Sequence, residues 1–257
     1  MFNRWPEKIS KAAEYFFTPF MYPGQFGKLT GLTLRNRPLV RELVHLTAHR
    51  KWFETVNPAV VIDVGGYIGA FALAMRTMLP ETWIYTFEPL PDNFAKLQHN
   101  MAGDARFTAF QTALGDRQGT TDFWRCDFVA SSSVLPMEDL HKEAFPATAC
   151  STKVTVPIAR LDDHLAEMHL KQPVLMKLDV QGFEAQALAG AGETLQQVDY
   201  ILTEVSHQPL YEGQVGFDEL YALMKSHGFT YSGGFDSLIS PVDGSILQSD
   251  ALFIRKA

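Results

Sequence analysis

Strand-like apolar runs alternate with helix-like segments along this chain from residue 59 onward, and no other feature restricts its fold more strongly. The runs lie at 59–63, 82–88, 107–114, 174–180 and 198–205, and the helix-like segments at 68–79, 91–101, 183–190 and 217–227. Because the runs are almost continuously apolar, they indicate parallel strands that helices cover on both faces. The sequence therefore predicts an α/β fold built on a mostly parallel sheet.

The C-terminal part departs from this alternation. The runs FTYSGG at 229–234 and DALFIRK at 250–256 are joined by a turn-rich link without a helical pattern. This arrangement predicts an antiparallel pair of strands that closes the sheet.

The middle of the chain is less regular. GTTDFWRC at 119–126 is expected to form a hairpin arm, and KVTVPIARLDDHL at 153–165 a strand followed by a short helix. The polar and aromatic stretch at 127–151 is long for a loop inside a compact domain, which is typical of a lid.

The first 51 residues are basic, whereas the rest of the chain is acidic. They hold nine Lys or Arg against three acids, an excess of six positive charges, in a chain of 257 residues with net charge −7. The acidic total argues against nucleic acid as a partner. Residues 36–54 carry leucines at helical spacings. We expect a helical extension at 1–55, either a solvated lid or a contact to a membrane surface or anionic carrier, and a main domain at 56–257.

Cysteine usage and the N-terminus bear on location. Cys126 and Cys150 form neither a zinc-binding spacing nor a disulfide framework, which suits a reducing compartment. The start MFNRWPEKIS has no apolar signal region, and the chain has no run of about 18 apolar residues. We expect a cytoplasmic protein without a transmembrane segment, and the sequence leaves its oligomeric state open.

The stretch VIDVGGYIGAFAL at 61–73 reads as a buried strand that breaks into glycines and continues as a helix. A dinucleotide site needs G-x-G-x-x-G, but counted from Gly65 the second and third glycines are replaced by Tyr67 and Ala70, which argues against NAD or FAD. S-adenosylmethionine has no phosphate and fits this loop, and its ammonium group accounts for an acid at the strand end. The residues expected to bind it here are Asp63, Gly65, Gly66, Tyr67 and Gly69.

The second strand ends in an acid, Glu88 of YTFEPLP, one strand–helix–strand step after Asp63. A carboxylate at this point can accept hydrogen bonds from both ribose hydroxyls of an adenosyl cofactor. The alternative is that Asp63 and Glu88 only cap the helices that follow. Ala113 and Leu114, after the third strand, are expected to line the adenine.

Six motifs follow one another through residues 58–208: VIDVGGYIG, FEPLPDNFAKLQHN, TALGD, SSS, LMKLDVQGFEAQALAGA and LTEVSH. Taken together they resemble the FkbM family of S-adenosylmethionine-dependent methyltransferases. The resemblance implies a seven-stranded class I methyltransferase fold, Rossmann-like with an antiparallel last strand, and usually O-methylation of sugar or secondary-metabolite hydroxyls. Two positions depart from the family, which usually carries Asn at Tyr67 and Glu at Gln181.

Methyl transfer to a hydroxyl requires alignment, exclusion of water and a base for the acceptor proton. The candidates lie at strand ends: Lys177 and Asp179, which share one face of their strand, and Glu204 and His207. His207 is the leading candidate for the general base, because an ordinary pKa of about 6.5 suits proton removal at neutral pH. The alternative is that His207 only caps the loop before Pro209.

Asp179 and Glu204 have a second interpretation. They either orient the acceptor hydroxyl or, together with His207, bind a divalent cation such as Mg²⁺ or Mn²⁺ that lowers the pKa of the hydroxyl. The sequence does not require this metal. Ser131, Ser132 and Ser133 are expected to hydrogen-bond the acceptor or the cofactor, unless they only form a loop. The acceptor is expected to be a small molecule or a glycan.

Three other functions fit parts of the sequence. Tyr221 and Lys225 have the Y-x-x-x-K spacing of short-chain dehydrogenases, but the phosphate-binding glycines are absent. Lys177 and Asp179 match half of the Lys-Asp-Lys-Glu set of RNA methyltransferases, although they lie close in sequence and the main domain is acidic. The two departures from the family leave room for a catalytically degenerate fold that serves as a binding module.

Overall fold

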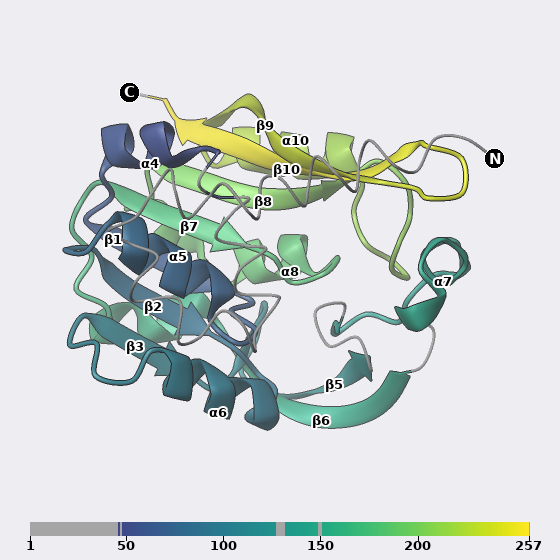
Figure 1. Ribbon diagram of the computed structural model, residues 1–257, viewed down its shortest axis with the longest axis horizontal. Coiled ribbons are helices and arrows are strands. Elements are labelled where there is room, and N and C mark those ends of the chain that lie inside the picture. The colour runs from purple at the N-terminus through teal and green to yellow at the C-terminus, as the bar shows by residue number, and fades with distance from the viewer. Residues whose placement is uncertain (1–45, 47, 127–131, 149–150, 257) are drawn as a thin grey trace, which may run out of the picture.

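The structure of the protein, a computed structural model, describes residues 46, 48–126, 132–148 and 151–256. Its main sheet consists, in spatial order, of β3 (Phe107–Phe110), β2 (Trp83–Phe87), β1 (Val60–Val64), β7 (Val174–Leu178), β8 (Tyr200–Ser206), β10 (Ile246–Arg255) and β9 (Phe229–Ile239). The first five are parallel, and β10 runs antiparallel to both of its neighbours (Figure 1). This is the predicted class I methyltransferase fold, including the antiparallel closing pair.

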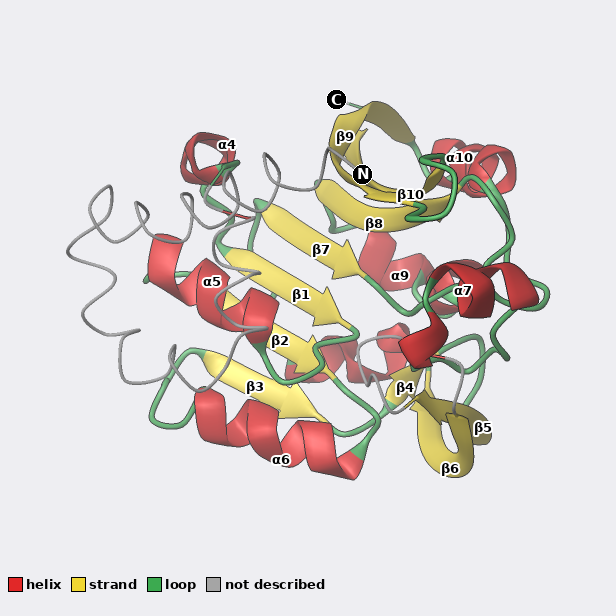
Figure 2. Cartoon of the chain, turned by 45° about the vertical axis from the view of Figure 1, so that its right-hand side comes forward, coloured by secondary structure: helices red, strands yellow, loops and turns green. Residues whose placement is uncertain are grey.

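Helices cover both faces of this sheet. One face carries α4 (Arg50–Val56), α5 (Ala70–Met78) and α6 (Pro91–Asn100), and the other carries α8 (Glu184–Ala189), α9 (Gly192–Leu195) and α10 (Phe217–Ser226). Successive residues of β1 point to opposite faces, so that Val61 packs with Met75 of α5 and Ile62 packs with Leu188 of α8. The strands therefore present apolar side chains to the helices on both faces, which explains why their apolar runs are continuous. Figure 2 shows α5 on the near side of the parallel strands.

The N-terminal extension is described only where it meets the domain. The predicted helix at 36–54 is observed in its last part as α4, whose Phe53 is fully buried. Trp52 makes edge contacts with Tyr200 of β8 and Phe235 of β9, with ring centroids 5.7 and 5.3 Å apart. The lid and membrane-contact predictions fall on residues 1–45, which lie outside the described residues.

A second, three-stranded sheet lies beyond the end of β3. It consists of β4 (Ala113–Leu114), β6 (Ser151–Ala159) and β5 (Gly119–Cys126), and β5 is the antiparallel partner of β6, as the hairpin prediction required. The prediction of one strand over 107–114 was wrong, because the chain leaves the main sheet after Phe110 and pairs with β6 from Ala113. A 3₁₀ helix, η3 (Leu161–Glu167), follows β6 as predicted.

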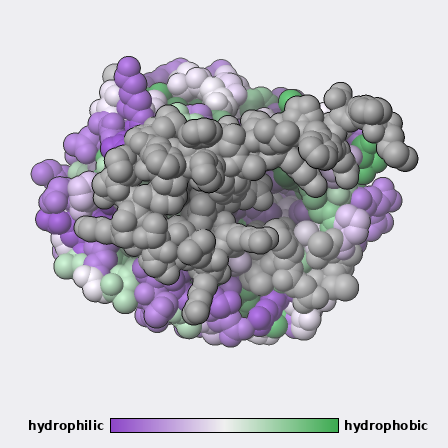
Figure 3. Space-filling view, viewed as in Figure 1, coloured by the Kyte–Doolittle hydropathy of each residue, from purple (hydrophilic) through white to green (hydrophobic). Residues whose placement is uncertain are grey.

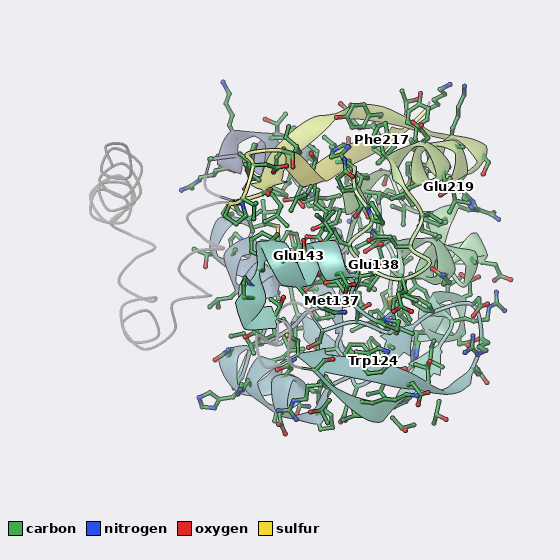
Figure 4. The ribbon with its side chains drawn as sticks, turned by 90° about the vertical axis from the view of Figure 1, so that its right-hand side faces the viewer. Trp124, Met137, Glu138, Glu143, Phe217 and Glu219 are labelled. Atoms are coloured by element: carbon green, nitrogen blue, oxygen red, sulfur yellow. The ribbon has the colours of Figure 1, made fainter. Side chains whose placement is uncertain are left out.

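The segment at 132–148 connects the small sheet with the far side of the main sheet. Ser133 pairs with Trp124 of β5, and Met137 pairs with Tyr211 in the loop after β8. The segment contains α7 (Asp139–Ala144) and a short 3₁₀ helix, η2 (Pro146–Thr148). Figure 4 looks onto the carboxyl ends of the strands and shows α7, with Glu138 and Glu143, between Trp124 and Phe217.

The outer surface of the described residues is hydrophilic in places where helices cover the sheet. Figure 3 shows mainly hydrophilic residues along the left and lower margins of the helix-covered face. Within the described residues, no helix combines the length and the apolar character that crossing a membrane would require.

His141 of α7 makes the stability of this segment sensitive to acid. The imidazole is buried, its Nδ1 has no hydrogen-bond partner among the described residues, and burial lowers its pKa to about 4. The unfolded chain therefore takes up a proton as the pH falls below about 6.5, whereas the folded protein does so only near pH 4. Stability from this group is present above pH 6.5 and is lost as the pH falls toward 4.

We expect His141→Phe to remove this loss. Between pH 7 and pH 4.5 the wild type should lose about 1–3 kcal/mol more than the variant, or several degrees in Tm. Thermal unfolding of both proteins across this pH range measures the difference. Because both proteins contain the same buried carboxyl groups, the contribution of those groups cancels in the comparison. His99→Phe, at an exposed position of α6, is the control. Parallel curves for wild type and His141→Phe would contradict the assignment.

Candidate functional site

A cavity of about 700 Å³ lies at the carboxyl ends of the parallel strands, where doubly wound sheets bind their ligands. Its floor comes from the ends of β1, β2, β7 and β8. The start of α5 and strand β4 close one side, and β9 and β10 close the other. Polar and charged groups gather at the strand ends, whereas apolar side chains line the cavity near β4 and α5.

The glycine loop after β1 forms the part of the floor closest to the backbone. Both Gly65 and Gly66 donate backbone N–H groups to the carbonyl of Phe87, at 3.0 and 2.9 Å. Gly65 has φ +85°, and a Cβ atom there would lie 1.8 Å from the carbonyl oxygen of Asp179. The loop therefore joins β1, β2 and β7 at one point. Gly65 and Gly66 also line the cavity, where a ligand can approach the backbone.

Glu88 lies at the end of β2, and its carboxylate is held by three donors. The backbone N–H of Tyr67 donates to Oε2 at 2.9 Å, while the N–H of Leu90 and the amide of Asn93 donate to Oε1 at 2.9 and 3.2 Å. Burial outweighs these hydrogen bonds and raises the pKa of Glu88 to about 7. A carboxylate has about four acceptor positions, so Oε2 can still accept a ligand hydroxyl from the cavity that Glu88 lines.

Tyr67 lies next to Glu88 in the cavity wall. Its backbone has φ +50°, a conformation unusual for a residue with a side chain. Its phenol is partly buried, and burial followed by the Glu88 charge raises its pKa. Tyr67 therefore presents a neutral phenol to the cavity beside an acid.

Asp63 and Gly69 lie behind the cavity wall rather than on it. Asp63 is fully buried; Oδ2 accepts a hydrogen bond from Thr86, and Oδ1 is 3.8 Å from the ammonium of Lys177. Asp63 is thus not among the residues that line the cavity, whereas Gly65 and Gly66 are. Gly69 allows α5 and α6 to pack closely, since a Cβ there would lie 2.8 Å from Leu97.

Lys177, Asp179 and Glu204 come together at the ends of β7 and β8, as predicted. Lys177 donates to Oδ2 of Asp179 at 3.0 Å, and all three residues line the cavity. Burial opposes ionisation of Asp179, but the Lys177 charge and hydrogen bonds outweigh it, so its pKa lies below the ordinary value. Burial and then the Asp179 charge raise the pKa of Glu204 well above its ordinary value. The surroundings therefore favour ionisation of Asp179 and oppose ionisation of Glu204.

Gln181 connects these carboxyl groups, although the sequence singled it out only as a departure from a family pattern. Its amide nitrogen donates to Asp179 at 2.8 Å and to Glu204 at 2.7 Å, and its amide oxygen accepts from the hydroxyl of Tyr211 at 2.5 Å. Gln248 of β10 also donates to Glu204, at 3.3 Å. No local spacing could reveal Tyr211 or Gln248, because both come from distant parts of the chain.

Glu184 at the start of α8 has a structural role. It is buried outside the cavity lining, and its Oε1 accepts the backbone N–H groups of Val180 and Gly182 at 3.3 and 3.1 Å. Burial raises its pKa to about 7. Glu184 therefore holds the turn that carries Gln181.

The structure does not bring His207 to the cavity. Its side chain is exposed and hydrogen-bonds through Nε2 to Ser249 of β10 at 2.9 Å, and only Ser249 lines the cavity. Asp179, Glu204 and His207 therefore do not assemble into the predicted cation site. Among the residues that the structure describes, no group of three or more His, Cys, Asp or Glu side chains is arranged to hold a metal ion.

The predicted serines separate in the structure. Ser131 lies outside the described residues. Ser132 lines the cavity, and its hydroxyl oxygen accepts a hydrogen bond from the backbone N–H of Cys126 at the end of β5, at 3.0 Å. Ser133 is buried, and its hydroxyl donates to the carbonyl of Gln181 at 2.6 Å. Ser133 thus acts on the site through Gln181.

Ala113 and Leu114 of β4 line the apolar part of the cavity, and their contact with an adenine stays a prediction. The sequence did not indicate the opposite wall, which contains Phe235, Ser237 and Ser249 of β9 and β10. The sequence predicted these two strands only as an antiparallel pair that closes the sheet. Tyr221 and Lys225, the dehydrogenase-like pair, lie on α10 and are not among the residues that line this cavity.

Comparison with known proteins gives one family and several relatives. The Methyltransferase FkbM domain matches residues 63–231. The 2-O-methyltransferase NoeI of Sinorhizobium fredii is 31% identical over 65% of this chain and 71% of its own length. The 31-O-demethyl-FK506 methyltransferase FkbM of Streptomyces tacrolimicus is 27% identical over 70% of this chain and 76% of its own. The hexuronic acid methyltransferase AglP of Haloferax volcanii is 29% identical over 59% of this chain and 58% of its own length.

Proposed function

This chain belongs to the FkbM methyltransferase family, and from that premise we propose that it transfers a methyl group from S-adenosylmethionine to a hydroxyl group of a sugar or related metabolite. The observation that carries the proposal is the cavity itself. Its glycine floor and Glu88 suit an adenosyl group, and an ionised carboxylate, Asp179, lines the same cavity.

The cofactor half of the proposal rests on the glycine loop and on Glu88. Gly65 and Gly66 line the cavity at the end of β1, and Oε2 of Glu88 retains acceptor capacity for a ribose hydroxyl. Ala113 and Leu114 supply apolar contact for an adenine ring. When bound, S-adenosylmethionine supplies an activated methyl group, so the protein has to align the acceptor and exclude water.

The acceptor half rests on Asp179 and Lys177. In this assignment Asp179 accepts the proton of the acceptor hydroxyl, because its carboxylate is ionised and its side chain is 30% exposed at the cavity. Lys177 holds that carboxylate in place and keeps it charged. His207 is not assigned this role, because it hydrogen-bonds to Ser249 and is not among the residues that line the cavity.

Names of the relatives suggest which acceptors to test. They name a 2-O-methyltransferase and a hexuronic acid methyltransferase. We therefore extend the proposal to carbohydrate hydroxyls, free or carried on a larger molecule, and the serines and amide at the β9–β10 side of the cavity offer hydrogen bonds suited to them.

The test uses methyl-deuterated S-adenosylmethionine and a panel of methyl hexopyranosides with the matching hexuronic acids. We expect a trideuteromethyl ether on at least one sugar by mass spectrometry, and undiminished turnover after EDTA treatment. Calorimetry with S-adenosylhomocysteine checks cofactor binding separately. Binding without transfer to any sugar would overturn the acceptor assignment, and loss of turnover with EDTA would restore the metal alternative.

A further inference from the structure

The amide of Gln181 occupies the centre of the carboxyl cluster, and none of the roles assigned above uses it. We propose that Gln181 is a positioning residue, which bridges Asp179 and Glu204 and holds the Asp179 carboxylate in the orientation that receives the acceptor hydroxyl. The inference rests on the proposed function for its catalytic consequence, whereas the bridge itself can be tested without an acceptor.

Both hydrogens of the amide are used. Nε2 lies 2.8 Å from Oδ1 of Asp179 and 2.7 Å from Oε2 of Glu204, so a single NH₂ group satisfies one oxygen of each carboxyl. Hydrogen bonds to ionised groups are the stronger kind. The other oxygen of Asp179 accepts from Lys177 at 3.0 Å. The carboxylate is therefore fixed from two sides, which defines the direction of its remaining lone pairs.

Tyr211 sets which way the amide points. Its hydroxyl donates to Oε1 of Gln181 at 2.5 Å. A flipped amide would put Oε1 against two carboxyl oxygens and NH₂ against the phenol, and would lose the donor at both carboxyl groups. Tyr211 is itself anchored, because it is 1% exposed and pairs with Met137 in the segment that carries α7.

The backbone of Gln181 is held as firmly as its side chain. It has φ +54°, a conformation that is sparsely populated by residues other than glycine and persists only where the surroundings impose it. Ser133 donates to its carbonyl at 2.6 Å. The next residue, Gly182, has φ +94°, and a Cβ atom there would lie only 3.0 Å from Cβ of Tyr211. The side chain is thus aimed at the two carboxyl groups by a restrained turn.

In this chain a neutral donor lies between two carboxyl groups, at a position where the family usually carries Glu. The charged or titratable groups that face the pair are Lys177 on β7, Glu184 on α8, Asp250 on β10 and the phenol of Tyr211. Most of these groups are acids. A carboxyl group in place of the amide would add another acid next to the ionised Asp179 and, once ionised, would accept rather than donate hydrogen bonds.

The first experiment compares Gln181→Glu, Gln181→Met and Tyr211→Phe with Gln196→Glu, an exposed control with the same added charge. On the sugar that the acceptor panel identifies, we expect kcat at pH 7 to fall about 10²-fold or more for both Gln181 variants and less for Tyr211→Phe, because a misplaced base forfeits a contribution of about 10²–10⁴. KM for the sugar and the Kd of S-adenosylhomocysteine should change little. The acid limb of the pH profile of kcat should move to higher pH in Gln181→Glu.

The second experiment needs no acceptor. A third buried carboxyl group has a raised pKa, so Gln181→Glu should lose stability relative to wild type as the pH rises from 5 to 8, whereas Gln196→Glu should not. Thermal unfolding with S-adenosylhomocysteine bound measures this. The bridge is overturned if Gln181→Glu follows the wild-type curve and, where a sugar is methylated, keeps the wild-type kcat and pH profile. A panel with no product would count against the proposed function alone.

Discussion

Asp179→Asn is expected to lower kcat by about 10²–10⁴-fold, the contribution that a well-placed base makes to proton transfer. The substitution keeps the shape of the side chain and removes its charge. Asparagine at this position can still accept from Lys177 but cannot take the acceptor proton. The Kd of S-adenosylhomocysteine should change little, since Glu88 and the glycine loop remain. Steady-state kinetics on a methylated sugar, with calorimetry alongside, measures both quantities.

Two further variants decide whether the effect belongs to Asp179. Asp122→Asn removes an exposed acid of β5 that pairs with Lys153, so it matches the change in charge away from the cavity, and full activity is expected. His207→Gln removes the histidine that sequence reasoning favoured as the base, and we expect kcat within about threefold of wild type, as for a surface position. A large loss with His207→Gln and none with Asp179→Asn would reverse the assignment.

The contrast between Asp179 and His207 shows what local sequence can predict about this site. Lys177 lies near the end of β7 and Asp179 directly follows that strand, so alternation alone places them on one side, and they are observed 3.0 Å apart. His207 follows the end of β8, where its backbone N–H bonds to the carbonyl of Leu247 and its ring bonds to Ser249. Both partners lie on β10, forty residues on, and no local spacing indicates them.

The strands and helices of the main sheet were predictable for a similar reason. A strand that is buried on both faces has a continuous apolar run, so β1, β2, β7 and β8 can be predicted from these runs alone. Helix starts were less certain. The helix expected from residue 68 begins at Ala70, because Gly69 adopts φ +86° and sets the N-terminal boundary. The exit from the main sheet after Phe110 has no glycine or proline to mark it.

The hydrogen bonds of Gln181 could not be predicted from the sequence, for a different reason. Its partners come from β7, β8, the loop at Tyr211 and the segment at Ser133, so its role depends on four elements meeting at one edge. A sequence shows that a residue departs from a pattern. Only the fold shows that a neutral amide there is surrounded by acids.

Glu88→Ala is expected to weaken the binding of S-adenosylhomocysteine by about 10- to 100-fold, because hydrogen bonds to a charged group contribute about 1.5–3 kcal/mol. Its carboxylate also holds the N–H groups of Tyr67 and Leu90. Part of the loss therefore comes from a loosened glycine loop. Glu88→Gln separates the two contributions, since an amide oxygen can satisfy one of these donors. Calorimetry at pH 8 is the measurement, and Glu81→Ala, at an exposed site, is the control.

The pH dependence of binding gives the sharper test of Glu88. Its pKa of about 7 means that the free protein holds a proton there in mild acid, whereas ribose hydroxyls donate to the ionised form. Affinity should therefore be constant above pH 8 and fall by up to about tenfold for each pH unit below 7. Glu184 titrates in the same range but does not line the cavity, so Glu184→Gln should keep this slope and Glu88→Ala should abolish it. A slope that survives in Glu88→Ala would place the adenosyl group away from the end of β2.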